Sequence, residues 1–462
     1  MAFKKTPEEW TYAIQVLQRS ASEFPACEVE KVKENFLVHV GARLTEAPRA
    51  DKWIGVRRIS LMKNQIEKLS EVPTCPRLLT LFLKDNRLKM INNDFFQSMS
   101  SLTILDLSFN PLTKLPSGIS KLVSLQHLDL SRTQLEELPK ELQALVNIKC
   151  LYSDYTFGLH KIPRKLIAKF SMLRVLRMFN CGPFGLFVHD ISEDSILFGG
   201  NEFLVEELLC LEVLNVLSID LRSNSALQKI FSSRNLHNLI DSLRLQGLEN
   251  IKSLNVCSLA TMKHLDTLHF LNCEDLEEVK IDFMCKVQEI REPHGFQNLQ
   301  SVRLWSCFKL KDLTWLILAP NLRSLDVSDC SDMEETIEIS KFGEVQRMMG
   351  NLNPLAKVKV FTLEVQPKLK SIHRNALSFP LLQQMNISEC PLLKKLPLDS
   401  SRAITNKHEF VIRGDKHWWE ELEWEDELLK TFFYPFSRSL TINRHQHECG
   451  KPEAELGCIC FV

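Results

Sequence analysis

The stretch "LTKLPSGISKLVSLQHLDLSRTQLEELPKEL", residues 112–142, places leucine or isoleucine at roughly every third position. An amphipathic helix would repeat its apolar residues at i, i+3, i+4 and i+7, and a half-buried strand would alternate. Here the spacing changes: "LQHLDL" (125–130) ends in an alternation, whereas "LPKELQALV" (138–146) returns to three and four. This mixture predicts a short strand, a turn and a short helix-like return.

The same mixture recurs along the chain. Blocks that match L-x-x-L-x-L-x-x-N/C-x-L follow one another at intervals of 22 to 24 residues, then weaken after 173–181 and recover at 265–273. About thirteen candidate blocks, roughly nine of them clear, begin at or near Val56, Leu78, Leu102, Leu125, Ile148, Leu173, Leu214, Ile240, Leu265, Leu299, Leu322, Val358 and Leu382, and the pattern is weakest near Leu214 and Ile240. One repeat cannot bury its inward face alone, so neighbouring repeats must stack. The predicted fold is therefore α/β: a leucine-rich-repeat solenoid, or horseshoe, with a short parallel strand per repeat and an irregular or helical convex side.

One polar position follows each predicted strand. Asparagine or threonine occupies it in four early repeats, where the side chain can satisfy backbone groups of the adjacent coil that would otherwise be buried unpaired. Those residues are Asn64, Asn86, Asn110 and Thr133, and cysteines take the place at Cys181, Cys273, Cys307, Cys330 and Cys390. We interpret these cysteines as small, buried, reduced thiols rather than metal ligands or disulfides.

Composition and motifs exclude several function classes. Lys and Arg number 57 against 58 Asp and Glu, so the net charge of −1 favours neither nucleic acid nor a membrane surface as partner. The start "MAFKKTPEEW" has no apolar signal core, and no run of 18 apolar residues follows, which predicts a cytoplasmic protein without a membrane span. No phosphate-loop, zinc-protease, nucleophile-elbow or dinucleotide motif occurs. The chain is therefore predicted not to be an enzyme.

The repeats set the expected segments. The predicted divisions are a helical remnant at 1–25, a cap at 26–54, leucine-rich repeats at 55–400, a C-terminal cap at 401–436 with several tryptophans, and a disordered tail at 437–462. Insertions at 181–210 and 279–296 are either tolerated surface loops or a functional edge. Leu-Pro pairs, such as Leu115-Pro116, predict where the convex segment starts, and a repeat without one, such as 299–313, is expected to be looser there. The tail's histidines and cysteines match no common zinc spacing.

The motifs resemble those of plant coiled-coil nucleotide-binding leucine-rich-repeat disease resistance proteins. The similarity covers roughly residues 26–436. It is carried by "ENFLVHVGARLTEAP" (34–48), "LPSGISKLVSLQHLDLSRTQLEELPKELQALVNIKCL" (115–151), "KIPRKLIAKFSMLRVLRMF" (161–179), "CPLLKKLPLDS" (390–400) and "HEFVIRGDKHWWEELEWEDE" (408–427). The remnant at 1–25 is similar to part of the family's nucleotide-binding region, but its coiled coil, phosphate loop and Met-His-Asp motif find no match. The family binds ADP and ATP, whereas the resemblance implies no cofactor for this chain.

The resemblance implies a non-enzymatic module of plant innate immunity. Such a module senses pathogen effectors, or host proteins that effectors modify, through its concave face, and a full-length immune receptor is a further possible partner. The alternatives are a splice or gene fragment of an ATP/ADP-switched immune receptor that has lost nucleotide binding and acts as a decoy or regulator, and a non-functional remnant. Candidate contact residues flank the inward leucines of the strands, because exposed aromatic and charged side chains anchor interfaces. They are Phe82, Lys84, Asp106, Phe109, His127, Asp129, Arg132, Arg177, Phe179, His269, Arg303, Trp305 and Asp326.

Overall fold

A computed structural model describes residues 36–182, 191–281, 296–349, 354–373, 379–398, 411–424 and 437–439. One sheet of 16 strands, all parallel to their neighbours, runs through these residues in chain order. Its strands are β1 (Phe36–Val38), β2 (Arg58–Ser60), β4 (Thr80–Phe82), β6 (Ile104–Asp106), β7 (His127–Asp129), β8 (Cys150–Tyr152), β9 (Val175–Arg177), β10 (Val216–Leu221), β11 (Ile240–Gln246), β13 (Thr267–Leu271), β15 (Ser301–Trp305), β16 (Ser324–Ser328), β17 (Val360–Glu364), β18 (Gln384–Ser388), β19 (Val411–Gly414) and β20 (Ser437–Ser439). The leucine-rich-repeat solenoid predicted from the sequence is confirmed.

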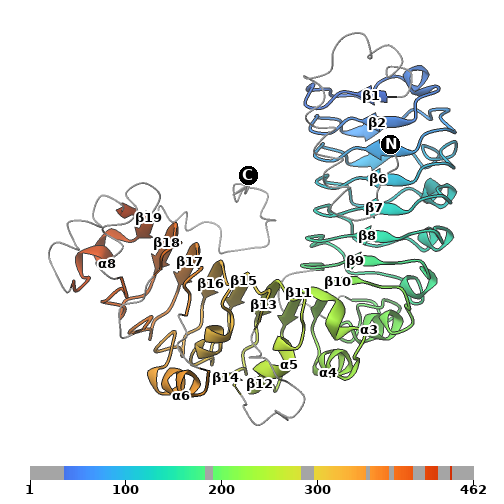
Figure 1. Ribbon diagram of the computed structural model, residues 1–462. Helices are drawn as coiled ribbons and strands as arrows, with labels where there is room; N and C mark the ends of the chain where they lie inside the picture. The colour runs from blue at the N-terminus through green and yellow to red at the C-terminus, as the bar shows by residue number, and fades with distance from the viewer. Residues whose placement is uncertain are drawn as a thin grey trace.

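Helices and two short strand pairs lie between the strands of the large sheet. The pairs are β3 (Lys68–Leu69) with β5 (Met90–Ile91), and β12 (Ser253–Asn255) with β14 (Glu278–Lys280). The α-helices are α3 (Glu202–Leu208), α4 (Asn224–Ser232), α5 (Val256–Ala260), α6 (Ile339–Met349) and α8 (Lys416–Glu420), and the 3-10 helices are η1 (Ala50–Trp53), η2 (Ser117–Lys121), η3 (Lys140–Ala144), η4 (Ile167–Lys169), η6 (His237–Leu239) and η8 (Thr314–Leu318). Figure 1 shows the strands along the inner side of an open arc, with α3, α4, α5 and α6 on its outer side. The arc changes direction near β10, where the straight stack that begins at β1 ends (Figure 1).

The core consists of leucines that stack from coil to coil. Leu81, Leu105 and Leu128 occupy the same register position on successive strands. Each of them is at most 1% exposed. Because side chains alternate across a strand, the residues on either side of each leucine face the inner side of the arc. The hydrophobic core therefore fixes which residues line the concave face.

The polar ladder forms as predicted. The side-chain amide of Asn110 donates to the carbonyl of Leu107 in its own coil and to that of Leu83 in the preceding coil, at 2.9 and 3.0 Å. Its oxygen accepts the Leu88 N–H at 3.0 Å. Cys273 is equally buried, and its thiol donates to the carbonyl of Leu245 at 3.6 Å. All five cysteines at this position are buried and free of disulfides, as expected.

The Leu-Pro pairs begin the convex segments, but a repeat without one is not looser. Pro116 is the residue before η2, and Pro139 is the residue before η3. The repeat that starts at Leu299 has no proline there, yet it forms η8, of which every residue is buried. Trp315 is 1% exposed and packs its ring edge-on against Phe296, 5.5 Å between centroids. A large buried aromatic ring holds this segment in place of the proline, so the expectation of a looser side was wrong.

Part of the first predicted insertion is integrated into the solenoid. Its helical end is α3, and Ile196, which precedes this helix, is completely buried. Gly200 has a φ of +73°, and a Cβ atom built on it would lie 2.7 Å from the backbone carbon of Arg222. The segment therefore packs closely on the turn after β10 and is not a simple surface loop.

Within the predicted C-terminal cap, the described residues 411–424 include two tryptophans that pack on the preceding repeat. Trp418 and Trp419 on α8 are each 7% exposed, and the indole of Trp418 donates to the Leu393 carbonyl at 2.9 Å. Several predictions fall outside the described residues: the helical remnant at 1–25, most of the insertion at 279–296, and the tail beyond β20.

Candidate protein-binding face

The strands bring the predicted contact residues together in two groups on the concave face. Phe82, Asp106, Asp129 and Arg177 lie in one row across β4 to β9, with Tyr152 between the last two. His269, Arg303 and Asp326 form a second row across β13, β15 and β16. The remaining candidates border these rows: Lys84, Phe109, Arg132 and Phe179 follow their strands, His127 lies at the start of β7, and Trp305 lies at the end of β15. Strands β10 and β11 separate the two groups.

Exposure divides the candidates. Trp305 is 42% exposed and Phe109 37%, and Arg132 and Arg303 are exposed as well. Lys84, His127, Asp129, Arg177 and Asp326 are half-buried. The expectation of exposure was wrong for four residues that are less than 9% exposed: Phe82, Asp106, Phe179 and His269.

Curvature explains part of this burial. The rings of Phe179 and His269 contact each other at 4.8 Å between centroids, although β10 and β11 separate their strands. Side chains on the inside of a bend converge, so these two rings cover one another. Burial, with the charges of Arg303 and Arg244 nearby, lowers the pKa of His269 well below its usual range. The imidazole is therefore neutral at physiological pH.

A row of stacked cations and rings borders the first group. Phe109, Arg132 and Tyr155 occupy the same position after three successive strands, each with a left-handed φ between 55° and 59°. The guanidinium of Arg132 lies 5.1 Å from the ring of Phe109 and 4.3 Å from that of Tyr155, and the Lys84 ammonium lies 4.9 Å from the Phe109 ring. Such contacts orient long side chains at modest energetic gain. They hold an aromatic and basic strip beside the concave face.

Two carboxylates lie side by side within the first group. Asp106 and Asp129 are register partners on β6 and β7, and each accepts a backbone N–H two residues further on, from Ser108 and Ser131. Burial, followed by the adjacent charge of Asp106, raises the pKa of Asp129 to about 7. The pair therefore carries less than two negative charges at neutral pH.

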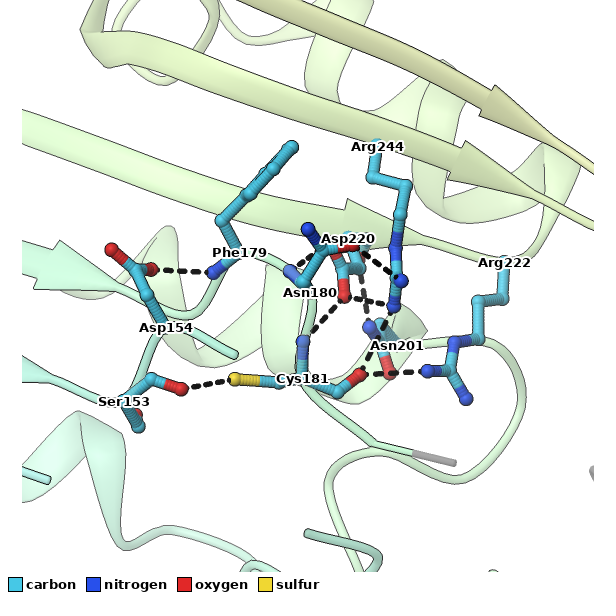
Figure 2. Close-up of polar contacts among 9 residues, drawn as sticks. All are labelled: Ser153, Asp154, Phe179, Asn180, Cys181, Asn201, Asp220, Arg222 and Arg244. Atoms are coloured by element: carbon cyan, nitrogen blue, oxygen red, sulfur yellow. Dashed lines mark hydrogen bonds and ion pairs between the residues drawn. The ribbon is translucent and has the colours of Figure 1, made fainter. Parts of the chain in front are cut away.

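A buried charged cluster lies near β10, where the arc changes direction (Figure 1), and Figure 2 shows its polar contacts. Asp220 on β10 and Arg244 on β11 are register partners, 2% and 0% exposed in their side chains, and 2.5 Å separates the ion pair. Asp220 also accepts the N–H groups of Asn180 and Cys181 at 3.0 and 2.9 Å. The guanidinium of Arg244 donates to the side-chain oxygen of Asn180 at 2.7 Å. The Cys181 carbonyl accepts from the guanidinium groups of both Arg244 and Arg222. Burial raises the pKa of Asp220 in spite of its cationic neighbours.

This cluster joins the turn after β9 to the next two strands. The sequence interpretation missed it, because the repeats near Leu214 and Ile240 match the template weakly. The available signal was a pair of charged residues that each lie between two aliphatic residues, in "IDL" (219–221) and "LRL" (243–245). A charge at such a position is ordinarily exposed on a concave face; here the bend buries it.

A pocket of about 430 Å³ opens beside this cluster, between the two groups of candidates. Its lining includes Asp154, Tyr155, Arg177, Phe179, Asp241 and Asp266. The register of β10 and β11 shifts between Leu217 and Ser218, so that Asp241 is the extra residue of a β-bulge. Its carboxylate receives the Arg177 guanidinium at 2.6 Å and the Ser218 hydroxyl at 2.5 Å. Sequence reasoning found only Arg177 and Phe179 of this lining.

The fold and the concave face define a class: the chain belongs to the leucine-rich-repeat proteins. The family described as Leucine-rich repeat region matches residues 55–386.

The individual proteins whose sequences are similar to this chain are plant disease resistance proteins. A probable disease resistance protein of Arabidopsis thaliana is 36% identical over 408 residues, which cover 87% of this chain and 40% of the relative. Disease resistance protein SUMM2 of the same plant is 37% identical over 416 residues, 89% of this chain and 44% of the relative.

The chain thus spans less than half the length of these relatives. Among solved structures, it is similar to the leucine-rich-repeat ectodomain of the Arabidopsis thaliana membrane receptor kinase GASSHO1/SCHENGEN3, solved with CASPARIAN STRIP INTEGRITY FACTOR 2. That similarity has a TM-score of 0.43 at 17% identity and covers 84% of this chain and 49% of the other. None of the helices among the described residues has the length and apolar character that spanning a bilayer requires.

Proposed function

We propose that this chain is a recognition module of plant innate immunity that binds a protein through its concave face. The observation that carries the proposal is Trp305, a large aromatic side chain that stays 42% exposed on the inner side of the sheet. Beside it, Arg303 and Asp326 form an exposed ion pair at 2.9 Å. Tryptophan and arginine dominate the binding energy of protein interfaces. The similarity to disease resistance proteins supplies the biological setting.

The proposed ligand is a pathogen effector or a host protein that an effector modifies, and a full-length immune receptor is the further candidate partner. The proposal includes no enzymatic step and no nucleotide cofactor for this chain, and it places the chain in the cytoplasm. A nucleotide-binding assay separates this module from an ATP-switching receptor: tight binding of ADP or ATP by the chain would contradict the proposal. Imaging of a fluorescent fusion in leaf cells tests the location.

The experiment that tests recognition is quantitative proximity labelling in plant tissue, followed by affinity measurement with the purified partner. The variant Trp305→Ala is compared with the wild type and with Val146→Ala, which removes an apolar side chain that is 52% exposed away from the strands. Loss of a central tryptophan costs about 2 kcal/mol or more, roughly 30-fold in Kd. We expect that loss for Trp305→Ala and no change for Val146→Ala. Equal affinities for all three proteins would contradict recognition through this face.

A further inference from the structure

The pocket between the two groups of candidates has a particular charge pattern. Three carboxylates line it, those of Asp154, Asp241 and Asp266, against one guanidinium, that of Arg177. The guanidinium of Arg177 forms an ion pair with Asp241 at 2.6 Å. The charges of the lining therefore sum to about −2 when all four groups are ionised. A further monovalent cation would halve this net negative charge.

The carboxylates are held in place by neutral donors. Asp154 accepts the Phe179 N–H at 2.8 Å, and Asp241 accepts the Ser218 hydroxyl at 2.5 Å. Asp266 accepts the Gln300 amide at 2.5 Å and the Thr267 hydroxyl at 3.2 Å. Each carboxylate oxygen has more than one lone pair, so acceptor capacity remains. The positions are thus preorganised, and Asp241 is directed there by its β-bulge.

One side of the pocket is aromatic. Tyr155 is half-buried and meets the buried ring of Phe179 edge-on, 6.2 Å between centroids. The guanidinium of Arg132 already lies 4.3 Å from the Tyr155 ring. Aromatic rings next to carboxylates suit a planar cation that stacks on one and donates to the other.

We propose that this pocket receives an arginine side chain of the recognised protein, so that Asp154, Asp241 and Asp266 act as its charge-complementary contacts. Arginine fits better than lysine, because its planar guanidinium carries five donors and can address two carboxylates at once. A volume of about 430 Å³ lies within the range of small binding pockets. The inference rests on the proposed function and adds the chemistry of the ligand.

The test is selection of displayed random peptides on the full chain. The selected peptides should share one arginine, and a synthetic copy with citrulline, which has the same shape without the charge, should bind about tenfold more weakly or worse. Asp241→Asn and Asp154→Asn should weaken the arginine peptide by a similar factor. The matched control is Asp332→Asn, which alters an exposed carboxylate paired with Lys368 at 2.7 Å elsewhere on the array. Thermal unfolding checks that each variant is folded; asparagine keeps the oxygen that accepts the Phe179 N–H.

A second readout is the pH dependence of binding. Burial raises the pKa of Asp154 to about 6. The Phe179 N–H and the charge of Arg177 lower this pKa, whereas the charges of Asp241 and Asp220 raise it. A bound cation favours the ionised carboxyl, so the affinity of the arginine peptide should fall as the pH drops below about 6. Asp154→Asn should flatten that dependence, which a purely structural role of Asp154 would not do.

The outcomes separate this inference from the proposed function. Two outcomes would overturn the pocket inference and leave the proposed function standing. In the first, the selected arginine peptides bind Asp241→Asn as tightly as the wild type; in the second, the selected peptides lack arginine and need Trp305 for binding. Competition by free arginine amide as strong as that of the peptide would point to a small molecule and also overturn it. An empty selection on folded protein counts against both. Arginine peptides that require Asp241, together with a plant partner whose affinity is unchanged by Trp305→Ala, would uphold the pocket and reject Trp305 as an anchor of the concave face.

Discussion

Replacing Arg244 by methionine tests whether the buried ion pair holds the bend of the solenoid. Methionine keeps much of the side-chain length and removes the charge. The substitution deletes the contact with Asp220 at 2.5 Å and the bond to the Asn180 side chain at 2.7 Å. Asp220, whose side chain is 2% exposed, then keeps the N–H groups of Asn180 and Cys181 as donors, and the charge of Arg222 still favours its ionised form. A buried carboxylate without its main counter-ion results.

The expected cost follows from this geometry. Breaking a buried ion pair by removing one partner costs about 3 to 5 kcal/mol. Because two backbone donors remain, we expect the lower end, about 3 kcal/mol at pH 7. Burial already raises the pKa of Asp220, and the loss of Arg244 raises it further. A group whose folded pKa exceeds its unfolded value stabilises the fold at low pH and loses this effect as the pH rises. Lowering the pH from 7 to 5 protonates Asp220 in the variant, so the loss of unfolding free energy caused by Arg244→Met should become smaller.

The assay is urea unfolding at both pH values, combined with amide hydrogen exchange of β10 and β11, since an array of repeats need not unfold as one unit. The double variant Asp220→Asn, Arg244→Met removes the isolated charge and should recover part of the loss; the recovery is partial because the asparagine oxygen replaces only one of the two carboxylate oxygens that accept N–H groups. Arg303→Met is the control, because its pair with Asp326 is exposed and worth at most about 1 kcal/mol. Equal losses for the two arginine variants, or a deficit independent of pH, would refute the reasoning.

Two further predictions concern single side chains. Asn110→Ala removes the side-chain partner of the Leu107 carbonyl and of the Leu88 N–H at a site 2% exposed, whereas the Leu83 carbonyl keeps the Asn86 amide as a donor. The substitution should therefore cost about 3 kcal/mol in urea unfolding, against less than about 1 for the exposed Asn147→Ala; comparable losses would contradict the ladder. Asp129 has a pKa of about 7 in the folded protein against an ordinary value of 3.8. This difference corresponds to about 4 kcal/mol of unfavourable free energy for the ionised carboxylate, which we reduce to about 2 kcal/mol because the half-buried group is screened by solvent. The protonated carboxyl of Asp129 contributes its full stability below pH 3.8, and this contribution is lost as the pH rises through 7 and the buried group ionises. The free energy of unfolding of Asp129→Asn should therefore exceed that of the wild type by about 2 kcal/mol at pH 8, and the difference should vanish at pH 4. Parallel curves of stability against pH for the two proteins would contradict this.

The polar ladder illustrates what repeat patterns predict well. Each repeat contacts its nearest neighbours, so an asparagine such as Asn110 meets the same environment in every coil. The stacking of Leu105 on Leu81 and Leu128 follows for the same reason. A local rule, applied to each coil in turn, was sufficient to predict the sheet, the inner face and the buried cysteines.

The convex side followed the rule less closely. Trp315 holds η8 without the proline that starts η2 and η3, because a large ring in the core can replace a restricted backbone. The pattern of Leu-Pro pairs could not reveal this alternative, since the partner ring of Trp315, that of Phe296, precedes the repeat's first leucine.

By itself, the sequence determined the repeat period, the core positions, the inner strand face and the resemblance to resistance proteins, because each depends on spacing within one or two coils. Only the tertiary structure decided that Phe179 and His269 are buried, that Asp220 and Arg244 pair inside the bend, and that Asp241 joins the pocket. These arrangements bring together side chains from neighbouring coils, as in Asp220 and Arg244, and from coils up to three apart, as in Phe179 and His269. Their proximity depends on a register shift and on the curvature summed over several repeats, which no single repeat encodes.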